Sequence, residues 1–150
     1  MSATTVTSPA YSGIDPRGPR VAASLTSVVL ALVLVTPTPV AAVLLAVQAV
    51  VFGIGAVRGV QHTPYAVLFR TAVRPRLAPP AELEDPRPPR FAQAVGLAFT
   101  GVAFVLLLAG ATVAALVAVG LALVAALLNA VLGLCLGCEL YLILRRATTR

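Results

Sequence analysis

Two long stretches of the chain contain no charged residue and predict membrane-spanning helices. The first covers residues 21–57 and the second covers residues 91–138. A helix needs roughly 20 apolar residues to cross about 30 Å of hydrocarbon, and a single helix over the second stretch would be about 72 Å long. Each stretch is therefore too long for one crossing. We predict that each folds into two helices joined by a tight turn.

Breaks in the helical pattern locate the two turns. The segment Thr36-Pro37-Thr38-Pro39 interrupts the first stretch, because proline removes a backbone donor and disfavours helix at the residue before it. Near the middle of the second stretch, Gly110 is the weakest helical position. The pattern therefore predicts four spans, at about residues 20–36, 39–57, 91–109 and 112–132.

Both halves of the chain carry a similar octapeptide ahead of their pair of spans. Residues 15–22 read Asp-Pro-Arg-Gly-Pro-Arg-Val-Ala and residues 85–92 read Asp-Pro-Arg-Pro-Pro-Arg-Phe-Ala, which are identical at six of eight positions. A two-span unit begins and ends on one side of the membrane, so its duplicate runs parallel to it, related by an axis along the membrane normal. We predict an all-α membrane protein of two parallel two-helix repeats, with short interfacial helices after spans two and four.

The predicted organisation divides the chain into four parts. They are a disordered tail rich in Ser and Thr, a first two-span repeat, a cytoplasmic connector and a second repeat, at residues 1–14, 15–74, 75–84 and 85–150. Between the second and third spans, Thr63-Pro64 can start a short helix that reaches about residue 73. We expect Tyr65, Leu68 and Phe69 of that helix to face lipid.

Charge predicts the orientation of these spans. All eleven basic residues are arginines that lie at or beyond the ends of the predicted spans, and neither short turn carries a charge. The positive-inside rule then places both termini and the central loop in the cytoplasm. A net charge of +6 favours contact with anionic lipid headgroups. Without a stacking or groove-reading element, it does not indicate nucleic-acid binding.

Composition agrees with a membrane location. The chain is 59% hydrophobic and 11% charged, whereas soluble domains carry about 25% charged residues. The use of Arg without Lys, together with abundant Ala, Val and Leu, is typical of a GC-rich bacterial genome. We therefore expect a multi-pass protein of a bacterial plasma membrane.

The only two cysteines are the strongest candidates for chemistry. Cys135 and Cys138 form a Cys-Leu-Gly-Cys motif at the end of the second apolar stretch. This spacing is used by dithiol oxidoreductases, in which one thiolate attacks and the second resolves the mixed disulfide. The motif is also compatible with cysteines that serve only as small packing residues, and with metal binding that would need two further ligands. We predict no cofactor and no metal.

The position of the helix end decides the environment of the thiols. A helix from residue 112 to residue 144 would be roughly 50 Å long, which overshoots the bilayer, so a break is expected at Gly133 or Gly137. If the helix restarts there, the thiols lie at a new N-terminus, where backbone amides stabilise thiolate. If it continues, apolar surroundings favour the neutral thiol.

Four other polar residues are weaker candidates. His62 and Glu139 could act as a base for the thiol pair, although an ordinary interfacial histidine and a solvated carboxylate are the commoner roles for such residues. Gln48 and Asn129 are amides within spans two and four, where interhelical hydrogen bonds are the usual role. No ionisable residue lies inside any span, which argues against an ion-coupled transporter.

Three segments of the second half resemble a known family. Residues 85–96, 126–130 and 134–141 are similar to the bacterial integral membrane proteins grouped as domain of unknown function 4395, which are common in actinobacteria. The similarity covers about residues 15–146, and the Cys-Leu-Gly-Cys segment is its most distinctive part. The resemblance implies a small polytopic membrane protein and no particular activity.

Three functional hypotheses follow from the sequence. In the first, Cys135 and Cys138 exchange with a thioredoxin-like or other cytoplasmic thiol partner. The alternatives are a structural or scaffolding membrane protein with inert cysteines, and a small-molecule carrier with a water-filled cavity lined by Gln48 and Asn129. Two glycine pairs with small-xxx-small spacing allow close helix contacts within the bundle or in a homo-oligomer; they are Gly55 with Gly59 and Gly133 with Gly137.

Overall fold

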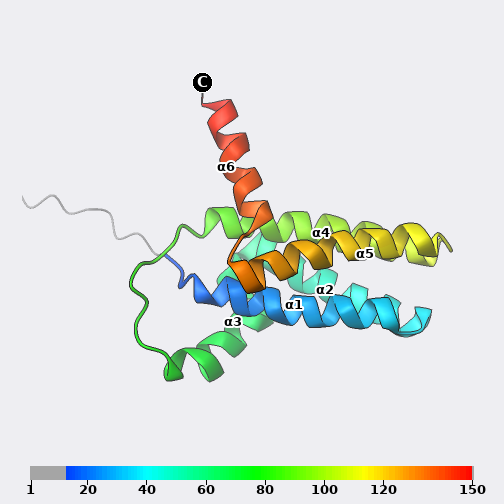
Figure 1. Ribbon diagram of the computed structural model, residues 1–150, viewed down its shortest axis with the longest axis horizontal. Coiled ribbons are helices and arrows are strands. Elements are labelled where there is room, and N and C mark those ends of the chain that lie inside the picture. Colours follow the sequence, from blue (N-terminus) through cyan, green and yellow to red (C-terminus); the bar gives the residue numbers. More distant parts are fainter. Residues whose placement is uncertain (1–12, 150) are drawn as a thin grey trace, which may run out of the picture.

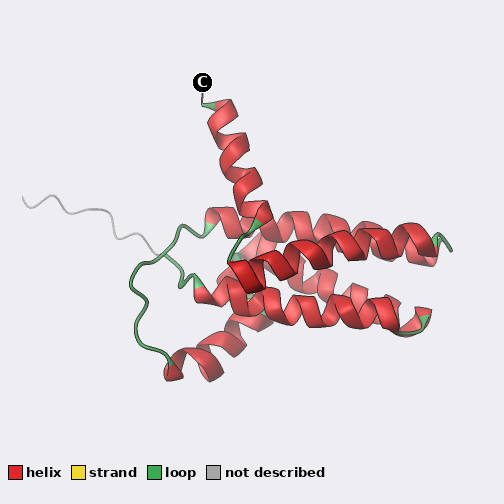
Figure 2. Ribbon diagram, viewed as in Figure 1, coloured by secondary structure: helices red, strands yellow, loops and turns green. Residues whose placement is uncertain are grey.

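The computed structural model describes residues 13–149, and helices dominate it (Figures 1 and 2). The long helices are α1 (Arg17–Val35), α2 (Thr38–Arg58), α4 (Arg87–Leu108) and α5 (Thr112–Leu127), the last of which continues through the π-helical turn η4 (Leu128–Leu132). The shorter elements are η1 (Val60–His62), α3 (Pro64–Leu68), η2 (Phe69–Val73), η3 (Arg74–Arg76) and α6 (Leu136–Thr148). The predicted all-α class with four spans is confirmed.

All four long helices are long and apolar enough to cross a membrane, so the chain is a membrane protein. The first and third spans begin three to four residues earlier than the sequence predicted, at Arg17 and Arg87. The reason is that the prolines of each octapeptide fit the first helical turn. A carboxylate precedes each start: Asp15 accepts the backbone N–H of Arg17 at 3.0 Å, and Asp85 accepts that of Arg87 at 2.9 Å.

The same aspartates pair with the arginine side chains two residues on. The Arg17–Asp15 ion pair measures 2.8 Å and the Arg87–Asp85 pair 2.7 Å. The Arg17 guanidinium holds the pKa of Asp15 below its ordinary value. Each octapeptide thus forms the same kind of helix start, with an aspartate paired to the arginine two residues later.

The four long helices run side by side, and both short turns lie at the end opposite the described arginines (Figure 1). Helix α1 packs against α2 and α5, and α4 packs against the same two. At the turn end the interior is closely filled by a core of buried residues: Leu30, Val33, Ala41, Leu45, Ala103, Leu107, Ala115 and Val119. The other end of the bundle holds the polar contacts and the cysteines.

Arginine side chains join the two halves at this polar end. Arg90 donates to the carbonyls of Ala56 and Val57 at 2.7 and 2.8 Å, at the end of α2. Arg20 makes the matching contact in the other direction, to the carbonyls of Ala130 and Val131 at 3.4 and 3.2 Å. Each octapeptide therefore satisfies the end of the second span in the other half. The duplication itself stays a prediction.

A short backbone pairing joins the residues immediately before the two octapeptides. Ile14 and Glu84 exchange two backbone hydrogen bonds, each 2.9 Å long, in an isolated antiparallel bridge. Residues 1–12 of the predicted disordered tail lie outside the described residues. Its last residue, Ile14, forms this bridge, and the extent of the disordered tail stays a prediction.

Gln48 makes the predicted interhelical hydrogen bond. Its side chain is fully buried, and its amide donates to Thr26 Oγ1 at 3.3 Å, which links α2 to α1. Its carbonyl oxygen accepts the Tyr65 hydroxyl at 2.7 Å. The expectation that Tyr65 faces lipid is therefore wrong, because the buried amide offers its hydroxyl an acceptor.

Phe69 is also turned inward, contrary to the sequence expectation. The side chain is only 3% exposed, and its ring lies against Gly18. A Cβ built at Gly18 would lie 3.4 Å from the ring, which is an ordinary van der Waals distance. Leu68 stays exposed, as expected. The helix itself starts where predicted, with Thr63 Oγ1 accepting the Ala66 N–H at 3.2 Å.

Two of the four glycines in the small-xxx-small pairs have a different role from the predicted one. Gly55 packs on α4, with the Gln93 side chain occupying the space beside it, and Gly137 packs on Ala92. Gly59 and Gly133 instead end their helices with φ angles of +103° and +69°, which side chains disfavour. The close contacts observed here lie within the bundle.

Replacing Arg90 tests the joint between the halves. Arg90→Ala should lower the free energy of unfolding by about 1.5 kcal/mol. This value is at the low end of the range for hydrogen bonds from charged donors, because the guanidinium is exposed. Arg90→Lys should rescue little, since an ammonium lacks the fork that reaches two carbonyls. Denaturant unfolding in detergent measures both. Arg146→Ala is the matched control, because this side chain makes no hydrogen bond or ion pair within residues 13–149; an equal loss there would contradict the prediction.

The Tyr65–Gln48 hydrogen bond predicts a loss of stability at alkaline pH. Burial raises the pKa of Tyr65 above its ordinary value of about 10. The stability that the neutral Tyr65 hydroxyl contributes is therefore fully present below the ordinary pKa, and it is lost as the pH rises through the raised pKa. Unfolding measured from pH 8 to 12 should show this loss, and Tyr65→Phe should remove it. Because the chain has no lysine, few other groups titrate there. Persistence of the same loss in Tyr65→Phe would contradict the assignment.

Candidate functional site

A break after the fourth span positions the cysteines. Gly133 adopts a left-handed conformation that ends η4, and its N–H donates to the Asn129 carbonyl at 3.0 Å. The next N–H, from Leu134, donates to the Leu128 carbonyl at 3.2 Å. The chain then restarts as α6 at Leu136. The break lies where the glycine pattern predicted it.

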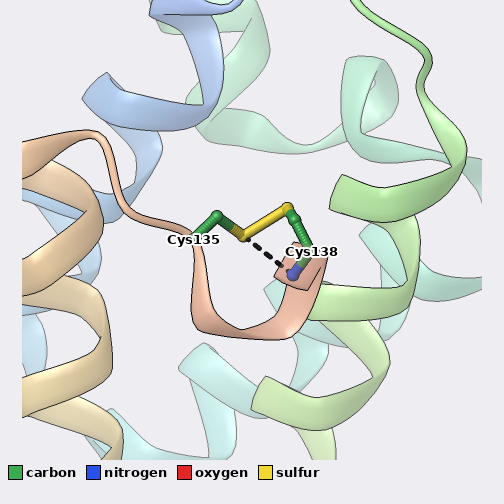
Figure 3. Close-up of a disulfide and its surroundings, with 2 residues drawn as sticks. All are labelled: Cys135 and Cys138. Carbon is green, nitrogen blue, oxygen red and sulfur yellow. Dashed lines mark hydrogen bonds between the residues drawn. A yellow bond between two sulfur atoms is a disulfide. The ribbon is translucent and has the colours of Figure 1, made fainter. Parts of the chain in front are cut away.

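Cys135 and Cys138 are joined by a disulfide, with their Cα atoms 5.2 Å apart (Figure 3). Cys135 is the N-cap residue of α6, and its Sγ accepts the backbone N–H of Cys138 at 3.3 Å. Both cysteines are half-buried. Of the two environments that the sequence left open, the structure therefore has the helix N-terminus, which favours the thiolate of Cys135 once the disulfide is reduced.

Close packing against α4 fixes the start of α6. A Cβ at Gly137 would lie 2.7 Å from the Ala92 Cα, so only glycine allows this approach. Farther along, the rings of Tyr141 and Phe91 lie 5.7 Å apart. Figure 1 shows α6 leaving the bundle at a steep angle to the four long helices. This direction places α6 along the membrane surface when the long helices cross it.

The two sulfurs have different surroundings. Cys135 lines a cavity of about 370 Å³ inside the polar half of the bundle. Cys138 is not among the residues that line this cavity and shares a face of α6 with Arg145, two helical turns further on. Cys135 thus borders the cavity, whereas Cys138 lies on the side of α6 that carries Arg145.

The structure does not bring His62 and Glu139 into contact with the sulfurs. His62 is exposed in η1, and Glu139 is exposed in the first turn of α6. Neither side chain forms a hydrogen bond or an ion pair with a cysteine in the part of the chain that the structure describes. The acidic side chain of Glu139 complements the positive end of the helix dipole. Their proposed role as bases remains a prediction.

Two features of the site were not predicted from the sequence. Arg20 lies beside the turn that leads to Cys135, with guanidinium atoms 3.8–3.9 Å from the position that a Cβ of Gly133 would take. Gln93 lines the same cavity as Cys135 and Asn129. Its position within the apolar third span was the only sequence signal. Among residues 13–149, no three His, Cys, Asp or Glu side chains gather as metal ligands.

The comparison with known families covers nearly the whole chain. The model of the family described as Domain of unknown function (DUF4395) matches residues 14–146.

The chain belongs to the DUF4395 family. This result confirms the resemblance to that family. No curated protein and no solved structure matches this DUF4395 protein, so the chemistry of its site is argued from its own residues.

Gly137→Ala tests how tightly α6 is held against α4. Because the new Cβ would meet the Ala92 backbone, α6 has to move away, at a cost of about 1–3 kcal/mol. We expect the Cys135–Cys138 disulfide to be reduced several-fold faster by a water-soluble phosphine, as measured by maleimide mass shift. Gly120→Ala is the control, since a Cβ there meets nothing within 4 Å. Equal rates in both variants would show that packing at Gly137 does not shield the disulfide.

Proposed function

We propose that this DUF4395 protein performs thiol–disulfide exchange through Cys135 and Cys138 at the cytoplasmic surface of a bacterial plasma membrane. One observation carries the proposal: Cys135 Sγ accepts a backbone N–H at the start of α6 while it is bonded to Cys138. That hydrogen bond stabilises a thiolate at Cys135, and a stabilised thiolate is a good leaving group in exchange.

The geometry supports a distinct role for each sulfur. A thiolate of the partner attacks Cys138, which lies on the basic face of α6, and forms a mixed disulfide. The bond between Cys138 and Cys135 breaks, and Cys135 leaves with the electron pair. The second thiol of the partner then attacks the mixed disulfide, which oxidises the partner and releases Cys138 as a thiol. The partner's two thiols release two protons in this reaction, and Cys135 and Cys138 take them up as they become thiols.

The surroundings of α6 favour a partner at the membrane surface. Helix α6 carries Leu140 and Ile143 on one side, 43% and 60% exposed, and Arg145 and Arg146 near its end. Such a helix can lie among lipid headgroups with its apolar side in the bilayer. The uncharged turns at the other end of the bundle support a cytoplasmic location for this face.

The other hypotheses gain less support. A carrier with a cavity lined by Gln48 and Asn129 is not favoured, because Gln48 is fully buried and both ends of its amide are hydrogen-bonded. Inert packing cysteines fit less well with two half-buried sulfurs at a helix start than with sulfurs enclosed in the core.

Single-cysteine variants test the proposal. In Cys135→Ser the Cys138 thiolate can attack the disulfide of the oxidised partner, which is the reverse of the step above, and the chain then has no second cysteine to resolve the product. Cells quenched with acid should therefore contain mixed disulfides that a reductant releases. Cys138→Ser leaves the stabilised thiolate, which should react with iodoacetamide at pH 7 at least about tenfold faster than the thiol of Cys135→Ser, since a lower thiol pKa leaves more thiolate.

Labelling with an impermeant maleimide provides the control for location. Cys135→Ser should resist labelling in intact cells and react after permeabilisation, and the double Cys135→Ser, Cys138→Ser variant sets the background. Slow alkylation of both single variants, without mixed disulfides, would assign the cysteines a packing role. Labelling in intact cells would place them on the outer face and refute the proposed location.

A further inference from the structure

The cavity beside the disulfide has the dimensions of a small-molecule site. Its volume of about 370 Å³ falls within the range of about 300–1,000 Å³ that is typical of such sites. Helices α1, α4 and α5 form most of its walls, and Cys135 contributes to the lining at the start of α6. A molecule held there would lie against a sulfur that the proposed exchange reduces.

Small side chains create this space. Alanine and glycine provide eight of the lining residues, among them Ala22 on α1, Ala92 on α4 and Ala125 on α5. The leucines and valines that fill the bundle interior lie nearer the turns. The hollow therefore results from the choice of residues in the half of the bundle that carries the disulfide.

The lining combines apolar surface with two amides. Gln93 on α4 and Asn129 on η4 both line the cavity, and neither side chain makes a hydrogen bond within the described residues 13–149. Amide N–H groups donate to carbonyl oxygens. A flat apolar molecule with carbonyl groups would satisfy these donors.

The cavity also reaches the outer surface of the bundle. Phe99 and Leu121 belong to its lining, although their side chains are 38% and 58% exposed. Both lie within helices that are apolar enough to span the membrane, so this surface meets hydrocarbon. A ligand can therefore enter from the bilayer.

We propose that this cavity binds a quinone, a lipid-soluble carrier of two electrons, beside Cys135. The inference rests on the proposed function and supplies its electron acceptor. In the reduced protein, the Cys135 and Cys138 thiols lose two protons and two electrons as their S–S bond forms. The quinone takes up both electrons and both protons and becomes a hydroquinone with two O–H groups. The protein thereby passes electrons from a dithiol partner to the quinone in the membrane.

The test uses the full chain in detergent, reduced and freed of reductant. Decylubiquinone is the probe, because its fully substituted ring has no hydrogen that a thiol can displace. Hydroquinone is followed by absorbance, and remaining thiols by maleimide mass shift. We expect one hydroquinone for each disulfide formed. The double Cys135→Ser, Cys138→Ser variant should form none.

A matched pair of variants places the reaction in the cavity. Ala125→Phe fills the hollow and should slow quinone reduction at least about tenfold, which corresponds to about 1.4 kcal/mol. Ala114→Phe is the control, because Ala114 lies on the same helix, is exposed and does not line the cavity. Asn129→Leu keeps the volume but removes the amide, so it should raise KM for quinone; it provides the test if Ala125→Phe does not fold.

Exchange with oxidised glutathione is measured for every variant, and quinone rates are expressed relative to it. A wild-type protein that exchanges with glutathione but does not reduce quinone overturns the quinone site and leaves the proposed function intact. A protein that does neither overturns both. Equal relative rates for wild type, Ala125→Phe and Asn129→Leu would show that quinone reacts outside the cavity, which also overturns the inference.

Discussion

Backbone carbonyls at the ends of the second and fourth spans impose the main constraint on this protein. The last carbonyls of a helix lack intrahelical partners, and near hydrocarbon they need a donor. Arg90 supplies one to the end of α2, and Arg20 supplies one to the end of η4. Because each arginine comes from the other half of the chain, satisfying the helix ends also holds the halves together. The position of Cys135, three residues after η4, depends on this joint.

One end of the bundle holds the close-packed core, and the other end holds the disulfide and the cavity. Near the turns, fully buried residues such as Leu30, Leu45 and Val119 fill the interior. Near the octapeptides, alanines and glycines leave a hollow beside the disulfide, and loss of buried apolar volume costs stability. The arginine contacts and the Gln48 hydrogen bonds lie in this same half. These polar contacts order this half of the bundle in place of close packing, and this half can therefore contain an open cavity.

The sequence predicted the elements better than it predicted the inward contacts. Long apolar runs and the prolines near residue 37 determined the spans. The physical limit of bilayer thickness required a break near Gly133 or Gly137, and the structure has it at Gly133. The inward positions of Tyr65 and Phe69 were missed, because their partners Gln48 and Gly18 lie on other helices. The periodicity of one helix does not show which of its faces meets another helix. Of the residues that line the cavity beside Cys135, only Asn129 was expected to border a cavity. The others were not predicted, since the cavity depends on small residues from several helices facing a common space.

The difference between the two sulfurs follows from where the last helix starts. Cys138 lies inside the first turn of α6, so its backbone is fixed by the helix, whereas Cys135 lies on the connection after a left-handed glycine. The backbone N–H of Cys138 is one of the free donors that every helix start presents, and it is directed at Cys135 Sγ. A sulfur held in this way can accept negative charge when the disulfide opens. The same sulfur lines the cavity, so the proposed exchange would leave its charge beside apolar side chains, where the proposed quinone could take up the electrons.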